Sequence, residues 1–147
     1  MAKAERAIEV DVTPERFAEV LQDYARYPEF LPDVKAVRVG EQRGEAVEVT
    51  YWLDARIKVI ELTLQHERRG PREFAWRLVR GELMELDEGT WTLRDTESGG
   101  THATYTIELR LAGRFSQTVE RALGEQGLPR LLANFKSRAE KLFPTAR

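Results

Sequence analysis

Residues 128–143 read Leu-Pro-Arg-Leu-Leu-Ala-Asn-Phe-Lys-Ser-Arg-Ala-Glu-Lys-Leu-Phe and form the longest apolar stripe of the chain. The apolar side chains recur every three or four residues, which places them on one face of an α-helix. They are Leu128, Leu131, Leu132, Phe135, Ala139, Leu142 and Phe143. We expect a long C-terminal helix whose apolar face another part of the protein must cover.

The same helical period begins upstream of this stretch. Its apolar positions there are Phe115, Val119, Ala122 and Leu123. Gly124, Gly127 and Pro129 interrupt the pattern, because these residue types break or bend a helix. Either one long helix is kinked at this point or two helices meet.

The middle of the chain alternates apolar and polar residues, which is typical of strands with one buried face. The segments are 37–39, 47–54, 60–66, 74–78, 91–93 and 103–111, with turn residues between them. Six strands at hairpin spacing predict an antiparallel meander. Between Glu82 and Asp95 the alternation is irregular, and a bulge there would invert which residues face inward.

Residues 7–12 predict a further strand, and a helix start follows it. Thr13 suits the N-cap, Pro14 the first helical position and Glu15 the positive end of the helix dipole. One apolar stripe then extends over about three turns. It contains Phe17, Val20, Leu21 and Tyr24. The two prolines within 27–32 predict a short second helix or turn.

These elements predict an α+β fold made of a single domain, residues 1–147. A curved antiparallel sheet of about seven strands, in the order β-α-α-β6-α, would wrap around the C-terminal helix. Because a strongly curved sheet around one helix rarely fills its own interior, we expect a ligand cavity between them.

The composition excludes several classes of function. The chain has 147 residues, a net charge of −2 and no cysteine, so thiolate metal sites, cysteine nucleophiles and generic DNA binding are not expected. We expect no transmembrane segment and no secretory signal, and the sequence contains no nucleotide-binding motif. We expect a cytoplasmic protein without a cofactor.

Several blocks resemble a known family. Residues 12–15 (Val-Thr-Pro-Glu) and 23–34 (Asp-Tyr-Ala-Arg-Tyr-Pro-Glu-Phe-Leu-Pro-Asp-Val) resemble the N-terminal signature of the polyketide cyclase/dehydrase branch of the START-like, helix-grip superfamily. Residues 78–81, 89–91 and 131–140 are similar to later blocks of the same pattern. This branch includes coenzyme Q-binding and ribosome-association-toxin relatives. The resemblance implies a helix-grip fold with a hydrophobic pocket, usually without cofactor or metal.

Strand parity predicts which side chains face the cavity. Phe74, Trp76, Tyr51, Tyr105 and Trp91 belong to the inward faces of different strands and would form an aromatic cleft for a flat or prenylated ligand. The full set of expected ligand-binding residues is Tyr51, Leu62, Leu64, His66, Phe74, Trp76, Trp91, Tyr105, Phe30, Leu132 and Phe135. An ordinary packed core is the competing interpretation.

Four residues are candidates for catalysis. His66, Tyr51 and Tyr105 could transfer protons, and Arg80, expected to follow Leu78 inward, could pair with a carboxylate or enolate. His102 has outward parity, so the two histidines should not meet and no metal site is expected. Glu85, Asp87 and Glu88 are interpreted as a solvated acidic cluster.

Three functions remain open. The first is non-catalytic binding of a lipid, isoprenoid or polyketide-like molecule, with 27–32 and the Gly124, Gly127 and Pro129 interruption as gates. The second is an aromatic polyketide cyclase or dehydratase. The third is contact with a ribosome or a membrane surface through the basic C-terminal helix, because residues 114–147 carry seven basic and three acidic side chains, a local charge of +4.

Overall fold

Seven antiparallel strands form one sheet in the order β1-β7-β6-β5-β4-β3-β2. The computed structural model describes residues 2–56, 58–113, 116–121 and 127–144. The strands are β1 (Ala2–Val10), β2 (Val34–Arg43), β3 (Ala46–Asp54), β4 (Val59–Arg68), β5 (Glu73–Gly81), β6 (Met84–Asp95) and β7 (Thr101–Leu111). The helices are α1 (Pro14–Gln22), the 3-10 helix η1 (Tyr24–Glu29), α2 (Ser116–Arg121) and α3 (Gly127–Leu142). The expected α+β helix-grip architecture is confirmed.

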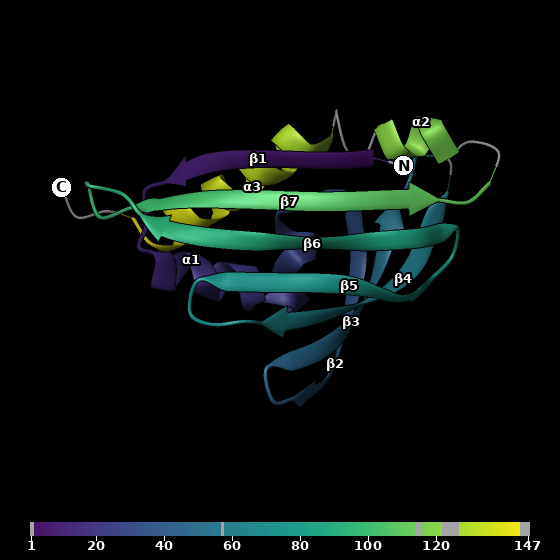
Figure 1. Ribbon diagram of the computed structural model, residues 1–147, viewed down its shortest axis with the longest axis horizontal. Helices are drawn as coiled ribbons and strands as arrows, with labels where there is room; N and C mark the ends of the chain where they lie inside the picture. Colours follow the sequence, from purple (N-terminus) through teal and green to yellow (C-terminus); the bar gives the residue numbers. More distant parts are fainter. Residues whose placement is uncertain (1, 57, 114–115, 122–126, 145–147) are drawn as a thin grey trace.

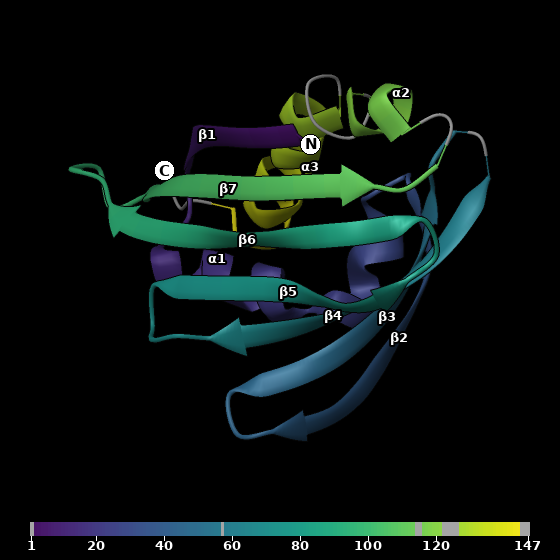
Figure 2. The same cartoon turned by 45° about the vertical axis from the view of Figure 1, so that its right-hand side comes forward.

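The sheet bends strongly, and helices α1 and α3 lie on its concave side (Figures 1 and 2). Strands β2 and β3 turn away from the plane of β1 and β7, as the view in Figure 2 shows. Helix α3 contacts β1 and α1, while η1 contacts β2. The helices therefore close the concave side from two directions.

The predicted start of α1 is confirmed in detail. The Thr13 hydroxyl accepts a hydrogen bond from the backbone N–H of Arg16 at 3.3 Å, and Pro14 stands in the first turn. Phe17 is fully buried beside Trp91, with ring centroids 5.5 Å apart. The helix is shorter than expected, because Asp23 leaves helical geometry and Tyr24 begins η1.

The inward orientation predicted for Arg80 is wrong. On β5, Leu78 pairs with Leu64 but Arg80 pairs with Thr63, so Val79 is an extra residue. Such a bulge reverses the parity of everything beyond it. The Arg80 side chain is 62% exposed and pairs with Glu48 on the outer face.

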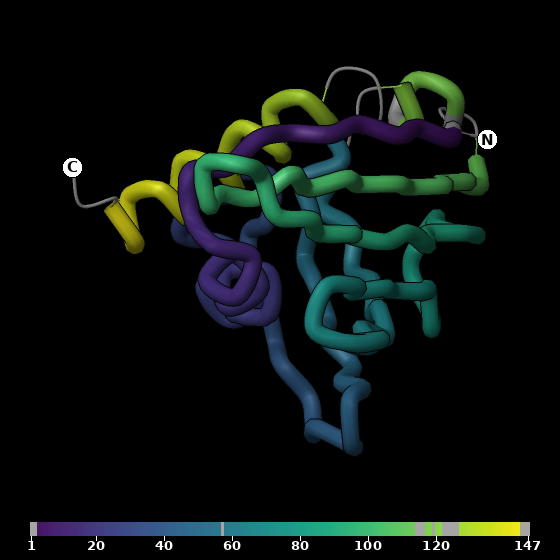
Figure 3. Tube along the Cα trace, turned by 60° about the vertical axis from the view of Figure 1, so that its left-hand side comes forward, coloured from purple at the N-terminus to yellow at the C-terminus, as the bar shows by residue number. Residues whose placement is uncertain are grey.

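The described residues of the C-terminal part contain two helices, α2 and α3. Phe115, Ala122, Leu123 and Gly124 lie outside the described residues. Helix α3 buries Leu128, Leu132, Phe135 and Ala139. Leu142 is 48% exposed, contrary to expectation, because the last turn of α3 extends beyond the sheet (Figure 3).

Two leucines of α3 give a matched test of this packing. Leu132 is 1% exposed, so Leu132→Ala should lower the free energy of unfolding by about 2–5 kcal/mol. Leu142→Ala, at an exposed site on the same helix, should change it by less than about 0.5 kcal/mol. Urea denaturation measures both values. An equal decrease in the free energy of unfolding for the two variants would contradict the packing of α3.

Candidate functional site

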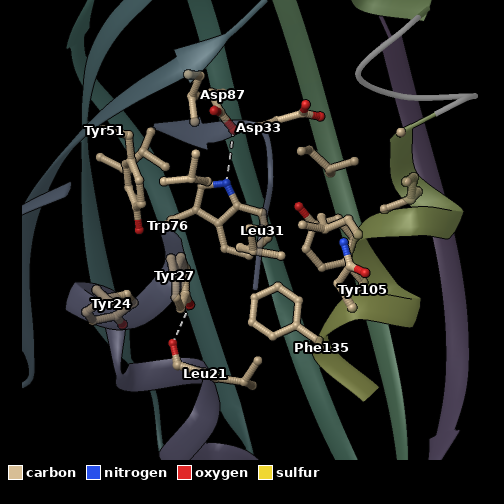
Figure 4. Close-up of a pocket in the computed structure, with 18 of the residues that line it drawn as sticks. Leu21, Tyr24, Tyr27, Leu31, Asp33, Tyr51, Trp76, Asp87, Tyr105 and Phe135 are labelled. Atoms are coloured by element: carbon tan, nitrogen blue, oxygen red, sulfur yellow. Dashed lines mark hydrogen bonds between the residues drawn. The ribbon is translucent and has the colours of Figure 1, made fainter. Parts of the chain in front are cut away.

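A cavity of about 210 Å³ lies between the concave face of the sheet and helices η1 and α3. Its walls come from β3, β4, β5, β6 and β7 on one side and from the helices on the other, as Figure 4 shows. Nine residues expected from the sequence line it. They are Tyr51, Leu62, Leu64, His66, Phe74, Trp76, Trp91, Tyr105 and Phe135. The parity of these strands was therefore predicted correctly.

Two expected residues do not line the cavity. Leu132 is 1% exposed and packs within the core. Phe30 lies on the outer side of Phe135, with ring centroids 5.2 Å apart, and the Arg138 guanidinium covers it at 5.2 Å. These residues support the wall from behind rather than forming its surface.

The aromatic rings hold one another in place. Trp91 contacts Tyr105 at 4.8 Å and Phe135 at 5.3 Å between centroids, both in edge-to-face geometry. Tyr27 meets Phe135 in the same way at 5.4 Å. Edge-to-face pairs add to the energy of burial, so the wall is preformed.

His66 and Tyr51 form a neutral hydrogen-bonded pair. The Tyr51 hydroxyl lies 2.8 Å from His66 Nε2, and the Tyr24 ring stands 4.3 Å from the imidazole. Burial lowers the pKa of His66 to about 3 and raises the pKa of Tyr51 well above its ordinary value. Both groups are uncharged at neutral pH, and a base this weak is poorly matched to proton abstraction there.

Asp87 is not the solvated surface residue that the sequence suggested. It is 6% exposed, lines the cavity and accepts a hydrogen bond from Trp76 Nε1 at 3.0 Å (Figure 4). Burial is the main cause that raises its pKa to about 7. Glu85 and Glu88 are exposed, as expected. The signal for Asp87 was its shared parity with Trp91, four residues along β6.

Regular strand pairing and a glycine account for this position. The register of β6 against β7 is continuous from Asp87 to Trp91, so Asp87, opposite Leu109, lies on the same inward face as Trp91. Gly89 stands opposite Trp76, and a Cβ there would lie 2.6 Å from the indole carbon Cζ2. The missing side chain leaves room for the indole beside Asp87.

Tyr105 carries an unused hydroxyl. Tyr27 donates its hydroxyl proton to the Leu21 carbonyl, and Tyr51 is paired with His66. Among the described residues, no hydrogen-bond partner is found for the Tyr105 hydroxyl or for the second carboxyl oxygen of Asp87. Burial raises the pKa of Tyr105, so its hydroxyl keeps its proton.

The less buried part of the wall comes from two segments. Pro32, Asp33 and Val34 precede and begin β2, while Gly127 and Arg130 lie in the first turn of α3. Both predicted gate segments therefore contribute to the wall. Their movement remains a prediction.

The outer face of α3 is partly neutralised by ion pairs. Lys136 bonds the Glu9 carbonyl and the Glu140 carboxylate, both at 2.7 Å, and Arg138 pairs with Glu29 at 3.0 Å. Contact with a ribosome or membrane surface remains a prediction. No helix in the described part of the chain is long and apolar enough to cross a membrane.

Known proteins share this architecture. Residues 1–140 match the model of the family described as polyketide cyclase / dehydrase and lipid transport. A START superfamily protein from Mycobacterium smegmatis is 14% identical with a TM-score of 0.81, over 95% of this chain and 98% of that one. The Zhui aromatase/cyclase from Streptomyces sp. R1128 is 18% identical with a TM-score of 0.82, over 95% and 94%. None of the curated proteins that were compared matches the sequence.

The carboxyl of Asp87 makes stability depend on pH. Its pKa is about 7 in the folded protein and near the ordinary 3.8 when unfolded, so the native state binds the extra proton between these values. The native state should lose stability as pH rises from about 4 to about 7. Asp87→Asn should not show this loss. Between pH 4 and pH 8 its free energy of unfolding should therefore rise relative to that of the wild type by up to about 4 kcal/mol.

Urea denaturation from pH 4 to pH 8 measures the effect. Glu85→Gln, at an exposed position on the same strand, serves as the control and should follow the wild type. A constant difference between Asp87→Asn and the wild type across this range would show that Asp87 titrates normally.

Proposed function

The chain belongs to the polyketide cyclase / dehydrase and lipid transport family, and from this premise we propose that it binds a small hydrophobic molecule between the sheet and α3. A lipid, an isoprenoid or a polyketide-like compound fits this description. The supporting observation is the cavity of about 210 Å³, walled mainly by aromatic and aliphatic side chains. Burial of the ligand provides the driving force, about 0.8 kcal/mol for each methylene removed from water.

The size of the cavity limits the ligand. An apolar cavity of about 150 Å³ holds benzene, whereas most ligand pockets enclose about 300–1,000 Å³. At about 210 Å³ this cavity has room for one or two rings, or a short branched chain. A longer molecule would extend past the less buried lining segments, which include Pro32 and Gly127.

Catalysis as an aromatic polyketide cyclase or dehydratase is the second candidate function. Asp87 supports it, because a carboxyl with a pKa of about 7 is matched to proton transfer at neutral pH. Of the expected catalytic residues, Tyr51, His66 and Tyr105 line the cavity and Arg80 lies outside it.

Tetralin, a two-ring hydrocarbon, provides a direct test of binding. It should raise the melting temperature of the wild-type protein, because a ligand that binds only the native state stabilises it. Leu131→Trp places a larger side chain on the cavity wall at the α3 side and should abolish the rise. Leu142→Trp, exposed on the same helix, should retain it. Calorimetry measures the dissociation constant of tetralin for the two tryptophan variants.

The absence of any binding to the wild type, or equal binding by both tryptophan variants, would contradict a ligand site in this cavity. Circular dichroism of Leu131→Trp verifies that the variant is folded.

Turnover separates the two candidate functions. If the protein is a cyclase, Asp87→Asn should lower the rate on a poly-β-ketone substrate by 10²-fold or more, on the order of a lost general acid or base. Product analysis by liquid chromatography measures the rate. Binding of the substrate with no product from the wild type would leave only the carrier function.

A further inference from the structure

Two oxygens on the sheet side of the cavity wall belong to buried side chains. The Tyr105 hydroxyl on β7 and the second carboxyl oxygen of Asp87 on β6 both belong to the cavity lining, and no partner is found for either among the described residues. Each side chain is at most 6% exposed. A polar atom that borders a cavity and has no partner within the protein can receive a hydrogen bond from, or donate one to, a ligand in that cavity.

The protonation states of Asp87 and Tyr105 determine whether their oxygens donate or accept hydrogen bonds. Trp76 donates to one Asp87 oxygen, which leaves the other to carry the acid proton when the carboxyl is neutral. Tyr105 is protonated, because burial raises its pKa. The two groups then present two O–H donors to the same cavity.

We propose that Asp87 and Tyr105 hold the carbonyl oxygen of a small cyclic ketone by two hydrogen bonds, so that the ligand is a ring ketone rather than a plain hydrocarbon or an amine. The inference rests on the proposed function, because it places a polar group of the ligand within the same cavity. Two donors directed at one acceptor oxygen are worth more in an apolar site than in water. The remaining rings of the ligand would lie against Trp91 and Phe135.

The surroundings of Asp87 favour the neutral acid. Tyr105 faces it from β7 and Tyr51 from β3, and both are uncharged hydroxyl groups. His66 on β4 is held neutral by burial. Glu88, on its own strand, raises the pKa of Asp87 further.

The charged residues of the lining lie at the less buried segments. Asp33 is paired there with Arg56, at 3.5 Å, and Arg130 is exposed. In the described wall we therefore find no cation directed at Asp87 that would hold it ionised.

Three ligands with one carbon skeleton test the proposal: 1-tetralone, tetralin and 1-aminotetralin. Calorimetry should give a dissociation constant for 1-tetralone about 5- to 10-fold below that of tetralin at pH 6. The affinity for 1-tetralone should fall about tenfold between pH 6 and pH 8, because ionisation of Asp87 removes one donor. Tetralin should bind equally at both pH values.

Single substitutions separate the two donors. The preference is the ratio of the dissociation constant for tetralin to that for 1-tetralone. In Tyr105→Phe this ratio should fall to less than half of its wild-type value. Asp87→Asn keeps an N–H donor and an acceptor for Trp76, so it should bind 1-tetralone with no dependence on pH. Glu85→Gln, exposed on the same strand, should show the wild-type preference for 1-tetralone and the wild-type dependence on pH.

The outcomes distinguish the inference from the proposed function. Equal affinity for 1-tetralone and tetralin would overturn the carbonyl site while leaving hydrophobic binding intact. Tightest binding of 1-aminotetralin, increasing with pH, would overturn it in favour of a cation held by ionised Asp87. Failure of all three ligands to bind would refute the proposed function itself.

Discussion

One amphipathic helix packed against a strongly bent sheet is the constraint on which this structure depends. Leu132 and Phe135 of α3 bury the apolar face of the helix, and η1 covers the sheet beside it. Because the side chains of one helix cannot reach every part of a concave sheet, space remains between them. That space is the cavity on which the proposed function depends.

The cavity wall contains packed aromatic rings and a small number of polar groups. The rings of Trp91, Tyr105 and Phe135 contact one another edge to face, so they form a preformed cavity surface. The polar groups are mostly satisfied within the protein, as in the pair formed by Tyr51 and His66. Asp87 and Tyr105 differ, since no partner is found among the described residues for the Tyr105 hydroxyl or for one oxygen of Asp87, and burial raises the pKa of Asp87 to about 7.

The order of elements and most of the inward-facing side chains could be predicted, because period-two and helical patterns report burial directly. The N-cap at Thr13 could also be predicted, because its hydrogen bond joins residues only three positions apart in the sequence. Arg80 was assigned to the wrong side because it lies beyond a β-bulge, which depends on pairing with a neighbouring strand and leaves no clear mark in the sequence. Asp87 was assigned to the surface because of its acidic neighbours Glu85 and Glu88, although its parity with Trp91 indicated the inward face.

A crystal of the protein exposed to xenon under pressure would test the cavity most directly, because xenon enters apolar voids without needing a specific chemical group. We expect xenon density between α3 and the strands that carry Trp76, Trp91 and Tyr105. A crystal that shows the same fold with no xenon there, and with side chains filling the space, would contradict the account.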